Sequence, residues 1–410
     1  MPTNANASPT PIAPMTPLAV THATAASALG IGRAAHASAL HDGTSGLRPD
    51  PWETVTLPTW IGRVDAVDDA ALPSHLAAWD CRNNRLAQLA LDADDFGAGV
   101  TKAAKRLGTH RVGVFVGTST SGILQTELAY RARAAAAGGA LPAWFDYART
   151  HNTGSVASFV REALRLQGPA FVVSTACSSG AKVFANAQRA IDAGLIDAAV
   201  VGGVDSLCLT TLYGFNSLEL LSSDIARPYD AKRNGLSIGE AAAFALVERD
   251  ADAATWLRGW GETSDGHHMS APHPEGKGAA MAMRDALARA GEQAGDIDYV
   301  NLHGTATPSN DAAEDLALTA VFGAGGVPCS STKGATGHTL GAAGALEALI
   351  AMLALETQRI PGGINRLEPD SALHAAYVDR ARDAALRLVM SNSFGFGGSN
   401  ASLVFGADRG

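Results

Sequence analysis

Continuous apolar segments that end in small polar residues recur along this chain, and each is followed by a helical pattern. The segments RVGVFVGTSTSG at residues 111–122 and DAAVVGGVDS at residues 197–206 have this arrangement. Strands of parallel sheets are buried on both faces and therefore lack the alternation of half-exposed strands. The chain is predicted to form βαβ units, with helices on both faces of a largely parallel sheet.

Two of these units lie in different halves of the chain and have the same layout. FVVSTACSSGAKVFANAQRAI begins at residue 171, and VPCSSTKGATGHTLGAAGALEALIAMLALE begins at residue 327. Each runs from a strand ending in Ser and Thr, through a Gly-bearing turn, into an Ala-rich helix, which suggests two similar halves. Because α/β proteins bind ligands at the carboxyl ends of their strands, these ends are expected to face a shared site. A stretch rich in Gly, Pro, Ser and His at residues 256–278 is the candidate boundary between the halves.

Composition narrows the class of protein. Of the 410 residues, 47% are hydrophobic and 17% are charged, which is typical of a globular protein with a large core. A net charge of −9, from 31 basic and 40 acidic residues, argues against binding to nucleic acid or to an anionic membrane surface. The four cysteines include no C-x-x-C pair, so neither a disulfide framework nor a cysteine-based zinc site is expected.

The chain also lacks recognisable targeting segments. The first residues, MPTNANASPTPIAPMT, have neither the basic nor the apolar region of a secretory signal, and they are predicted to form a disordered tail. The longest apolar run, EALIAMLALE, is shorter than the roughly 20 residues that span a bilayer. We therefore expect a soluble, cytoplasmic protein without a membrane span.

Cys177 lies where the first of the two repeated strands meets its helix. The alternative interpretation is a packing residue, since most free cysteines are small and buried. A thiol in the first turn of a helix, however, lies near the positive end of the helix dipole, which favours the thiolate. Cys177 is therefore predicted to be a nucleophile.

His303 ends a second apolar strand, in the segment DYVNLHGTATPSNDAAE. A lone histidine at a strand end would usually be structural. Here the following loop adds the hydroxyls of Thr305 and Thr307, and the next helix adds the carboxylates of Asp311 and Glu314 on neighbouring turns. This density of polar groups indicates a functional site.

The second repeated unit supplies Lys333 and His338 in a glycine-rich loop, followed by Glu347 on the helix. The pattern G-x-x-x-x-G-K-[ST] of phosphate-binding loops is absent, so the loop is expected to place an ammonium and an imidazole instead. Near the C-terminus, SNSFGFGGSN around Phe396 predicts a strained turn whose backbone N–H groups could face a ligand. His267, His268 and His273 are interpreted as structural, so no metal site is expected.

Four of these segments together resemble a known family. STACSSG, HGTATPSND, KGATGHTLGAAGALE and NSFGFGGSN occur in the order found in the elongating β-ketoacyl-[acyl carrier protein] synthases of the thiolase superfamily, and RPYDAKRNGLSIGEAAAFALVE is similar to another segment of these enzymes. The resemblance runs from about residue 20 to residue 406. It implies a thiolase-like, five-layered αβαβα fold of two duplicated halves, here residues 17–260 and 261–410, after a tail at residues 1–16.

The resemblance also implies roles for individual residues. Cys177 corresponds to the acyl-accepting nucleophile, His303 and His338 to the paired histidines, and Lys333 to the lysine before the second of them. Phe396 matches the gate residue, whose backbone N–H would join that of Cys177 in an oxyanion hole. The residues expected to contact the pantetheine arm are Thr305, Thr307 and Ser270. Those expected to support the site are Asp311, Glu314 and Glu347. Glu314 is the expected ion-pair partner of Lys333.

The implied activity is that of a 3-oxoacyl-[acyl carrier protein] synthase without a cofactor, which condenses a malonyl thioester with an acyl chain held on the cysteine. Its implied partners are an acyl carrier protein, with its phosphopantetheine arm, and either a second copy or a chain-length-factor-like ketosynthase. A non-catalytic chain-length-factor subunit is the alternative, but such subunits lack the nucleophile. A thiolase would carry a second catalytic cysteine near the C-terminus, where NSFGFGGSN has none. An initiating synthase would carry an asparagine in place of the second histidine, which here is His338.

Some segments depart from those of the fatty-acid enzymes. These segments are GTSTSGIL at residues 117–124, WDCRNNRLAQLAL at residues 79–91, LCLTTLYGFNSLELLS at residues 207–222 and TWIGRVD at residues 59–65. They are similar to ketosynthases of aryl-polyene pigment pathways. The predicted setting is therefore fatty acid, polyketide or aryl-polyene biosynthesis, and the acyl chain could be a growing polyene.

Overall fold

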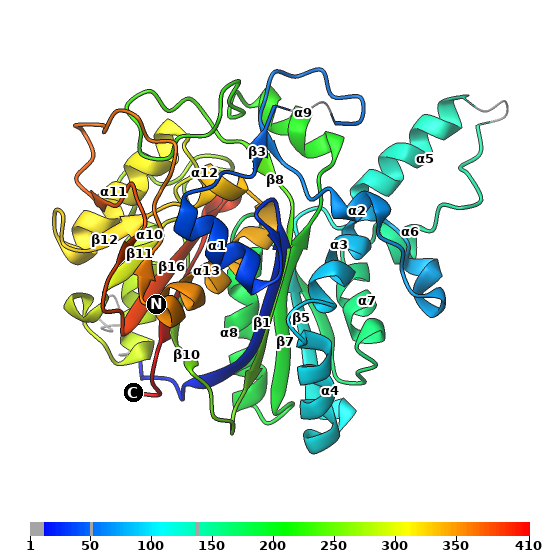
Figure 1. The fold of residues 1–410 in the computed structure, drawn as a ribbon, viewed down its shortest axis with the longest axis horizontal. Coiled ribbons are helices and arrows are strands. Elements are labelled where there is room, and N and C mark those ends of the chain that lie inside the picture. Colours follow the sequence, from blue (N-terminus) through cyan, green and yellow to red (C-terminus); the bar gives the residue numbers. More distant parts are fainter. Residues whose placement is uncertain (1–11, 50–51, 136–138) are drawn as a thin grey trace, which may run out of the picture.

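The computed structural model describes residues 12–49, 52–135 and 139–410, so the first 11 residues of the expected N-terminal tail lie outside the described part of the chain. One large mixed sheet runs through both halves of the molecule, and two small sheets lie beside it (Figure 1). The strands of the large sheet are β1 (Leu18–Ser27), β2 (Gly30–Ile31), β5 (Val112–Gly117), β6 (Ala170–Val173), β7 (Ala198–Asp205), β9 (Ala241–Glu248), β10 (Thr255–Ser264), β11 (Tyr299–Asn301), β12 (Pro328–Ser330), β14 (Ala376–Tyr377), β16 (Leu388–Gly395) and β17 (Ser399–Gly406). The small sheets contain β3 (Leu47–Arg48), β4 (Ile61–Gly62) and β8 (Ile238–Gly239) in one, and β13 (Arg359–Ile360) and β15 (Arg382–Asp383) in the other.

Helices occupy much of the remaining described chain. The α-helices are α1 (Arg33–Asp42), α2 (Ala66–Asp69), α3 (Arg82–Leu91), α4 (Phe96–Leu107), α5 (Ile123–Ala135), α6 (Tyr147–Thr150), α7 (Ser155–Ala163), α8 (Ser179–Asp192), α9 (Leu209–Ser217), α10 (Lys277–Ala290), α11 (Pro308–Phe322), α12 (Lys333–Thr336) and α13 (Ala343–Thr357). Short 3-10 helices are η1 (Ser74–Trp79), η2 (Thr109–Arg111), η3 (Ala294–Asp296), η4 (Leu340–Ala342) and η5 (Phe396–Gly398).

The two halves of the large sheet have the same topology. The N-terminal half has the spatial order β6-β5-β7-β9-β1, and the C-terminal half has the order β12-β11-β16-β17-β10. In the N-terminal half, β6, β5 and β7 are parallel neighbours, and β9 is antiparallel to both β7 and β1. In the C-terminal half, β12, β11 and β16 are parallel neighbours, and β17 is antiparallel to both β16 and β10. The expected duplication is therefore confirmed. The sheet was expected to be largely parallel, but it is mixed. In each half the last strand, β9 or β17, pairs in antiparallel orientation with the strand before it in sequence.

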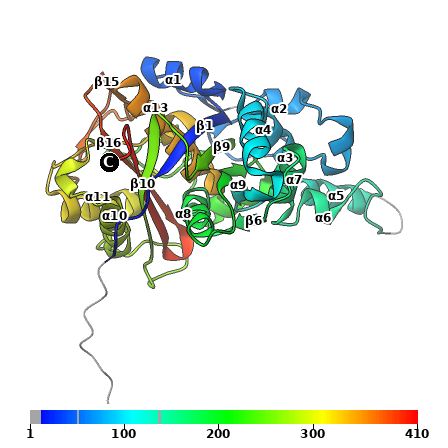
Figure 2. The ribbon, with the colours of Figure 1, turned by 90° about the horizontal axis from the view of Figure 1, so that it is seen from below.

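The helices form three layers around the two half-sheets. Helices α8 and α13 pack on each other and lie between the half-sheets, because α8 contacts β5 and β7 while α13 contacts both β9 and β16. Helices α3, α4 and α7 cover the outer face of the N-terminal half, and α10, with α11 against it, covers that of the C-terminal half (Figure 2). This is the thiolase-like αβαβα arrangement that the sequence resemblance predicted.

The stretch expected to interrupt the halves is in part a strand. β10 occupies Thr255–Ser264, and the irregular segment begins only after it. Its glycines serve close packing, since a Cβ on Gly259 would lie 2.2 Å from Ala286 O and one on Gly261 would lie 1.8 Å from Ala282 O. The backbone of α10 therefore rests directly on this strand. The proposed boundary between residues 260 and 261 falls within β10, and the division of the chain there stays a prediction.

Helix α13 forms the centre of the core. Its residues from Ala343 to Leu355 are all buried, in contact with the inner faces of both half-sheets. Within the described residues, one helical segment, Leu340–Thr357, is long and apolar enough to cross a membrane, but 89% of it is buried inside the protein. An apolar surface that is covered on all sides in this way is typical of a core helix.

We predict that Leu349→Ala in α13 lowers the free energy of unfolding by about 2–5 kcal/mol, because it leaves a cavity at a fully covered position. The control is Leu367→Ala, at a side chain that is 72% exposed, which should change it by less than about 0.5 kcal/mol. Urea unfolding followed by circular dichroism measures both. Equal effects of the two substitutions would contradict this description of the core.

Candidate active site

The candidate catalytic residues lie just beyond the ends of equivalent strands in the two halves. Cys177 follows β6 and precedes α8, and Lys333 and His338 follow β12 and precede α13. His303 follows β11, the neighbour of β12. Since α8 and α13 pack together between the half-sheets, the loops that precede them meet, and the structure brings these four residues into one site.

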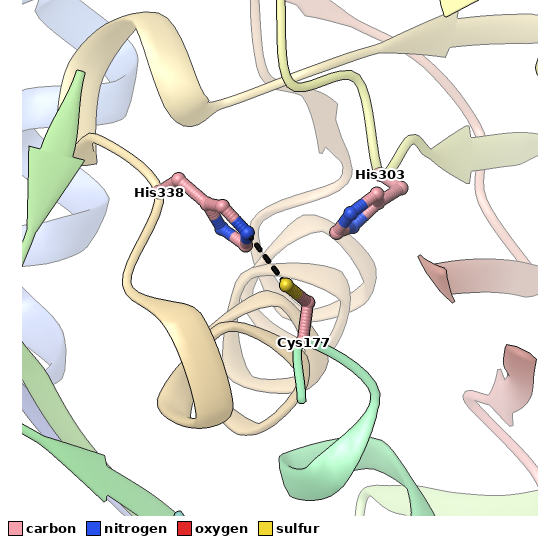
Figure 3. A group of neighbouring side chains, drawn as sticks. All are labelled: Cys177, His303 and His338. Atoms are coloured by element: carbon pink, nitrogen blue, oxygen red, sulfur yellow. Dashed lines mark hydrogen bonds between the residues drawn. The ribbon is translucent and has the colours of Figure 1, made fainter. Parts of the chain in front are cut away.

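Cys177, His303 and His338 converge (Figure 3). The Nε2 atom of His338 lies 2.9 Å from Cys177 Sγ, within hydrogen-bonding distance for sulfur. The two imidazole rings are 5.3 Å apart and nearly perpendicular, with an interplanar angle of 84°. One nitrogen of each ring and Sγ lie within 4.8 Å of one another, so this group has the ligand types and the spacing to hold a metal ion. The same convergence also suits acyl transfer, because a thiol and two imidazoles face one small space.

Cys177 is more deeply buried than its expected role suggested. It is 5% exposed, and it precedes the N-cap residue Ser178 instead of lying in the first turn of α8. Burial raises the pKa of its thiol to about 12, while the charge of Lys333 and a backbone hydrogen bond from Phe396 act in the opposite direction. The resting cysteine is therefore a thiol rather than the expected thiolate, because the loss of hydration outweighs the Lys333 charge and the Phe396 N–H.

Both histidines are neutral near pH 7. Burial lowers the pKa of His303 and of His338 well below the usual value, and the nearby Lys333 ammonium lowers both further. Lys333 Nζ lies 3.4 Å from His303 Nδ1 and donates to the His303 carbonyl oxygen. An ammonium only donates hydrogen bonds, so the proton of the neutral His303 ring lies on Nε2, which faces the site. His338 Nδ1 has no hydrogen-bond partner among the described residues.

The carboxylates are arranged differently from the sequence-based expectation. Lys333 Nζ forms a buried ion pair with Glu347 of α13, and not with Glu314. Glu314 instead accepts hydrogen bonds from the backbone N–H groups of His303, at 2.8 Å, and of Gly304, at 2.7 Å. Burial raises the pKa of Glu347 to about 7 and the Lys333 ammonium limits that rise. Lys333 thus contacts His303.

Asp311 also supports the loop that follows His303. Its carboxylate accepts hydrogen bonds from the backbone N–H groups of Tyr229, at 2.9 Å, and Ala306, at 3.2 Å. A positively charged partner, Arg233, lies 3.7 Å away. Asp311 therefore joins this loop to the segment before β8.

Phe396 lies opposite Cys177 on the loop between β16 and β17. Its ring packs on that of Phe215 at a centroid distance of 5.4 Å, and its backbone N–H points to the sulfur. Gly397 and Gly398 follow with φ angles of 79° and 71°, which only glycine adopts readily. A Cβ on Gly395 would lie 3.2 Å from the backbone nitrogen of Cys177, so this loop passes directly over the nucleophile.

A cavity of about 50 Å³ opens beside these groups. Both polar and apolar residues line it. Its lining includes Ser270, Thr305 and Thr307, the residues predicted to contact pantetheine, together with residues that the sequence reasoning did not assign, namely Asp265, Asn310, Asn400, Phe215, Leu220, Leu236 and Phe394. The only earlier signal for Phe215 and Leu220 was that their segment departs from the fatty-acid enzymes.

Each of four equivalent loops carries one non-glycine residue with a left-handed backbone. They are Ser121 after β5, Ala176 after β6, Ala306 after β11 and Leu340 after β12. Such a conformation costs on the order of 1 kcal/mol or more and persists where the surroundings enforce it. Three of the four lie within three residues of Cys177, His303 or His338, so the backbone is constrained where the side chains must be placed.

The relatives found by comparison are named as 3-oxoacyl-[acyl-carrier-protein] synthases. The chain is 39% identical over 260 residues to the mitochondrial 3-oxoacyl-[acyl-carrier-protein] synthase of Arabidopsis thaliana, a match that covers 58% of this chain and 56% of that protein. A 3-oxoacyl-[acyl-carrier-protein] synthase 2 of Rhizobium meliloti is 40% identical, with 58% of this chain and 61% of the relative covered. The chain thus spans less than two thirds of these two relatives. The synthase 2 of Coxiella burnetii is 35% identical, with 72% and 75% covered.

Solved structures match over a longer region. A structure of the ketosynthase ApeO in complex with its chain length factor ApeC, from Xenorhabdus doucetiae, superimposes with a TM-score of 0.88 at 38% identity, over 95% of this chain and 98% of the other. The ishigamide ketosynthase/chain length factor gives a TM-score of 0.85 at 28% identity, over 96% and 99% of the two chains. Residues 96–253 match the N-terminal domain of beta-ketoacyl synthases and residues 255–366 match the C-terminal domain. The chain therefore belongs to the beta-ketoacyl synthase family.

Proposed function

We propose that this chain is a 3-oxoacyl-[acyl carrier protein] synthase that joins an acyl group held on Cys177 to a malonyl thioester. The observation that carries the proposal is the contact of 2.9 Å between Cys177 Sγ and His338 Nε2, with His303 completing the group. A thiol beside a neutral imidazole and an N–H donor suits covalent acyl transfer. Family membership and the relatives at 35–40% identity support the same reaction.

The first half-reaction moves the acyl group from its carrier to Cys177. The sulfur attacks the thioester carbonyl carbon, and its proton passes to His338 Nε2, which can accept it when the neutral ring carries its own proton on Nδ1. The backbone N–H groups of Cys177 and Phe396 stabilise the oxyanion. The carrier thiolate then leaves and takes the proton back from His338. Since burial keeps the resting thiol protonated, deprotonation is coupled to attack.

The second half-reaction forms the carbon–carbon bond. The malonyl thioester loses carbon dioxide, and the electron pair left behind is held as an enolate. His303 donates Nε2–H to the enolate oxygen, and His338 adds a second donor in its other tautomer. The enolate carbon attacks the acyl carbonyl on Cys177, and the cysteine leaves as a thiolate. The thiolate is protonated by one proton taken up from solvent and passed on through His338 Nε2. Atoms and charges balance without a cofactor.

Lys333 and Glu347 have a supporting role in this proposal. Lys333 contacts the ring and the carbonyl oxygen of His303, and Glu347 neutralises its charge in the core. A buried ion pair is costly to break, because the remaining charge is left without hydration. The pair therefore fixes the tautomer and the orientation of His303. Glu314 fixes the backbone of the same loop.

Substrate and partners are part of the proposal. Ser270, Thr305 and Thr307 are polar residues that line the cavity, and they would hydrogen-bond the phosphopantetheine arm of an acyl carrier protein. The apolar lining residues, among them Phe215 and Leu236, would contact the acyl chain. The departures from the fatty-acid enzymes and the 38% identity to ApeO support a specialised setting, such as an aryl-polyene pathway.

A second ketosynthase-like subunit is the proposed structural partner. Strand β6 is an edge of the large sheet, and its Phe171 side chain is 57% exposed. An open edge with an apolar side chain can pair with another chain. Two of the matched structures are described as ketosynthases with a chain length factor, which supports a heterodimer with such a subunit. A homodimer is the alternative assembly. All four cysteines are free and buried, consistent with a cytoplasmic enzyme.

The alternative function is that of a chain-length-factor subunit without catalysis. Such a subunit needs neither a nucleophile nor its partners. The contact of Cys177 with His338 and the buried Lys333–Glu347 pair favour the catalytic subunit.

The chain, alone or with a candidate chain length factor, should extend an acyl group by two carbons when given acyl and malonyl carrier proteins. Cys177→Ala should load no acyl group and form no product, because no other residue replaces the sulfur. Mass spectrometry of the carriers and of the intact chain measures both. A packing cysteine provides the control, since Cys208→Ala should still become acylated. Normal loading of the Cys177→Ala chain would contradict the nucleophile assignment.

His303→Ala should still accept the acyl group, but its rate of carbon dioxide release should fall by about 10²–10³, because the enolate loses a donor. Release of labelled carbon dioxide from malonyl carrier protein measures this rate. His75→Ala, at an exposed position, should leave the rate unchanged. If both variants released carbon dioxide at the wild-type rate, His303 would have no role in decarboxylation.

Alkylation of Cys177 by iodoacetamide should speed up about tenfold per pH unit from about pH 7 to about pH 10, without a plateau. The reason is that burial raises the pKa of the thiol to about 12, so the reactive thiolate fraction keeps growing over this range. Mass spectrometry of the Cys177 peptide measures the rate. A plateau above about pH 8.5, as for an exposed cysteine, would show that the resting thiol is not held protonated by burial.

A further inference from the structure

Asp205, the last residue of β7, is a fully buried carboxylate that the reaction described above does not use. None of the ion pairs found among the described residues includes it. An isolated carboxylate is costly to bury unless hydrogen bonds replace its lost hydration. Its surroundings therefore have to supply many donors.

The donors come from two segments. The loop after β5 gives the hydroxyl of Thr118, at 2.6 Å, the backbone N–H of Ser119, at 2.9 Å, and the backbone N–H of Thr120, at 3.1 Å, and the hydroxyls of Ser119 and Thr120 also bind. The second segment gives the backbone N–H of Gly341, 2.6 Å from Oδ2. One carboxylate thus joins the loop beyond β5 to the loop that carries His338.

This junction lies directly behind the catalytic group. Gly341 comes three residues after His338, and a Cβ added to it would lie 2.5 Å from the backbone nitrogen of Ser119. Gly180 comes three residues after Cys177, and its added Cβ would lie 2.8 Å from Gly341 O. The Cys177 and His338 segments are therefore in backbone contact at the position that Asp205 holds.

The negative charge of Asp205 does not help the reaction at Cys177. Burial is the main cause that raises the pKa of Cys177, and the negative charge of Asp205 raises it further. A neutral residue at this position would favour the thiolate. The benefit of Asp205 must therefore come from its hydrogen bonds.

We propose that Asp205 is a positioning residue, whose carboxylate holds the Thr118–Thr120 and Gly341 backbones so that His338 Nε2 stays in contact with Cys177 Sγ. This proposal concerns the same site as the proposed function and rests on it for its catalytic meaning. The contact itself can be measured without any acyl or malonyl carrier.

Asp205→Asn provides the test, because charge and position predict opposite results. The amide has one acceptor oxygen instead of two and adds donors that face N–H groups, so the Gly341 loop should shift. If positioning dominates, alkylation of Cys177 by iodoacetamide should slow by about 10- to 100-fold at each pH, because a displaced His338 no longer donates a hydrogen bond from Nε2 to the thiolate, and a misplacement of about 1 Å has effects of this size. If charge dominates, removal of the negative charge should speed the reaction. An unchanged or faster rate overturns the proposal.

Asp315→Asn is the matched control. Asp315 is equally buried and also accepts backbone hydrogen bonds, from His374 at 2.9 Å and Ala375 at 2.8 Å. This variant should lose stability, seen in urea unfolding, while the pH profile of Cys177 alkylation stays that of the wild type. A profile altered to the same extent in both variants would mean that loss of stability, and not position, explains the result.

Ser119→Ala keeps the proposal testable if Asp205→Asn does not fold. It removes one hydroxyl donor and leaves the backbone N–H bonds in place, so alkylation should slow by about threefold. A wild-type rate in this folded variant would overturn the proposal. If the wild-type chain forms no condensation product, the proposed function fails, whereas the alkylation rates still decide the role of Asp205.

Discussion

The close contact between the start of α8 and the start of α13 determines where the catalytic groups lie. A Cβ on Gly180 would come within 2.8 Å of the backbone of Ala345, and one on Gly344 would come within 2.5 Å of the backbone of Ala181. The two helices therefore approach as closely as backbones allow, and only glycine permits this. Because Cys177 and His338 lie on the loops that lead into these helices, their separation depends first on this contact between main chains, and the Asp205 carboxylate adds a hydrogen bond to it at Gly341.

Duplication then places different chemistry on equivalent backbones. The two half-sheets share one strand order, and the third strand of each is followed by a loop and a helix of the middle layer. One loop supplies a sulfur nucleophile and the other supplies an ammonium and an imidazole. The left-handed residues Ala176 and Leu340 precede the two helices in both halves, so the strain that orients the loops is part of the repeated backbone.

Much of the fold and the set of site residues could be predicted from sequence, because strand ends and glycine-bearing turns are local features. Three details could not. The choice of Glu347 over Glu314 as the partner of Lys333 depends on which helix packs beneath the ammonium. The raised pKa of Cys177 depends on burial by segments far away in the chain, which the residues around Cys177 in the sequence do not reveal. The glycines of β10 resembled a loop, since their reason, the close approach of α10, is visible only in three dimensions.

The glycine contact between α8 and α13 has a consequence for how such a chain can change over evolution. Larger side chains cannot enter that contact without separating the nucleophile from its base, so the reaction chemistry tolerates little variation there. The apolar wall formed by Phe215, Leu220 and Leu236 belongs to α9 and to the segments that lead into β8, outside the middle layer. Substitutions there can alter the shape of the cavity while the reacting atoms stay in place. New substrates can therefore be acquired by mutation on one side of the site without loss of the reaction on the other.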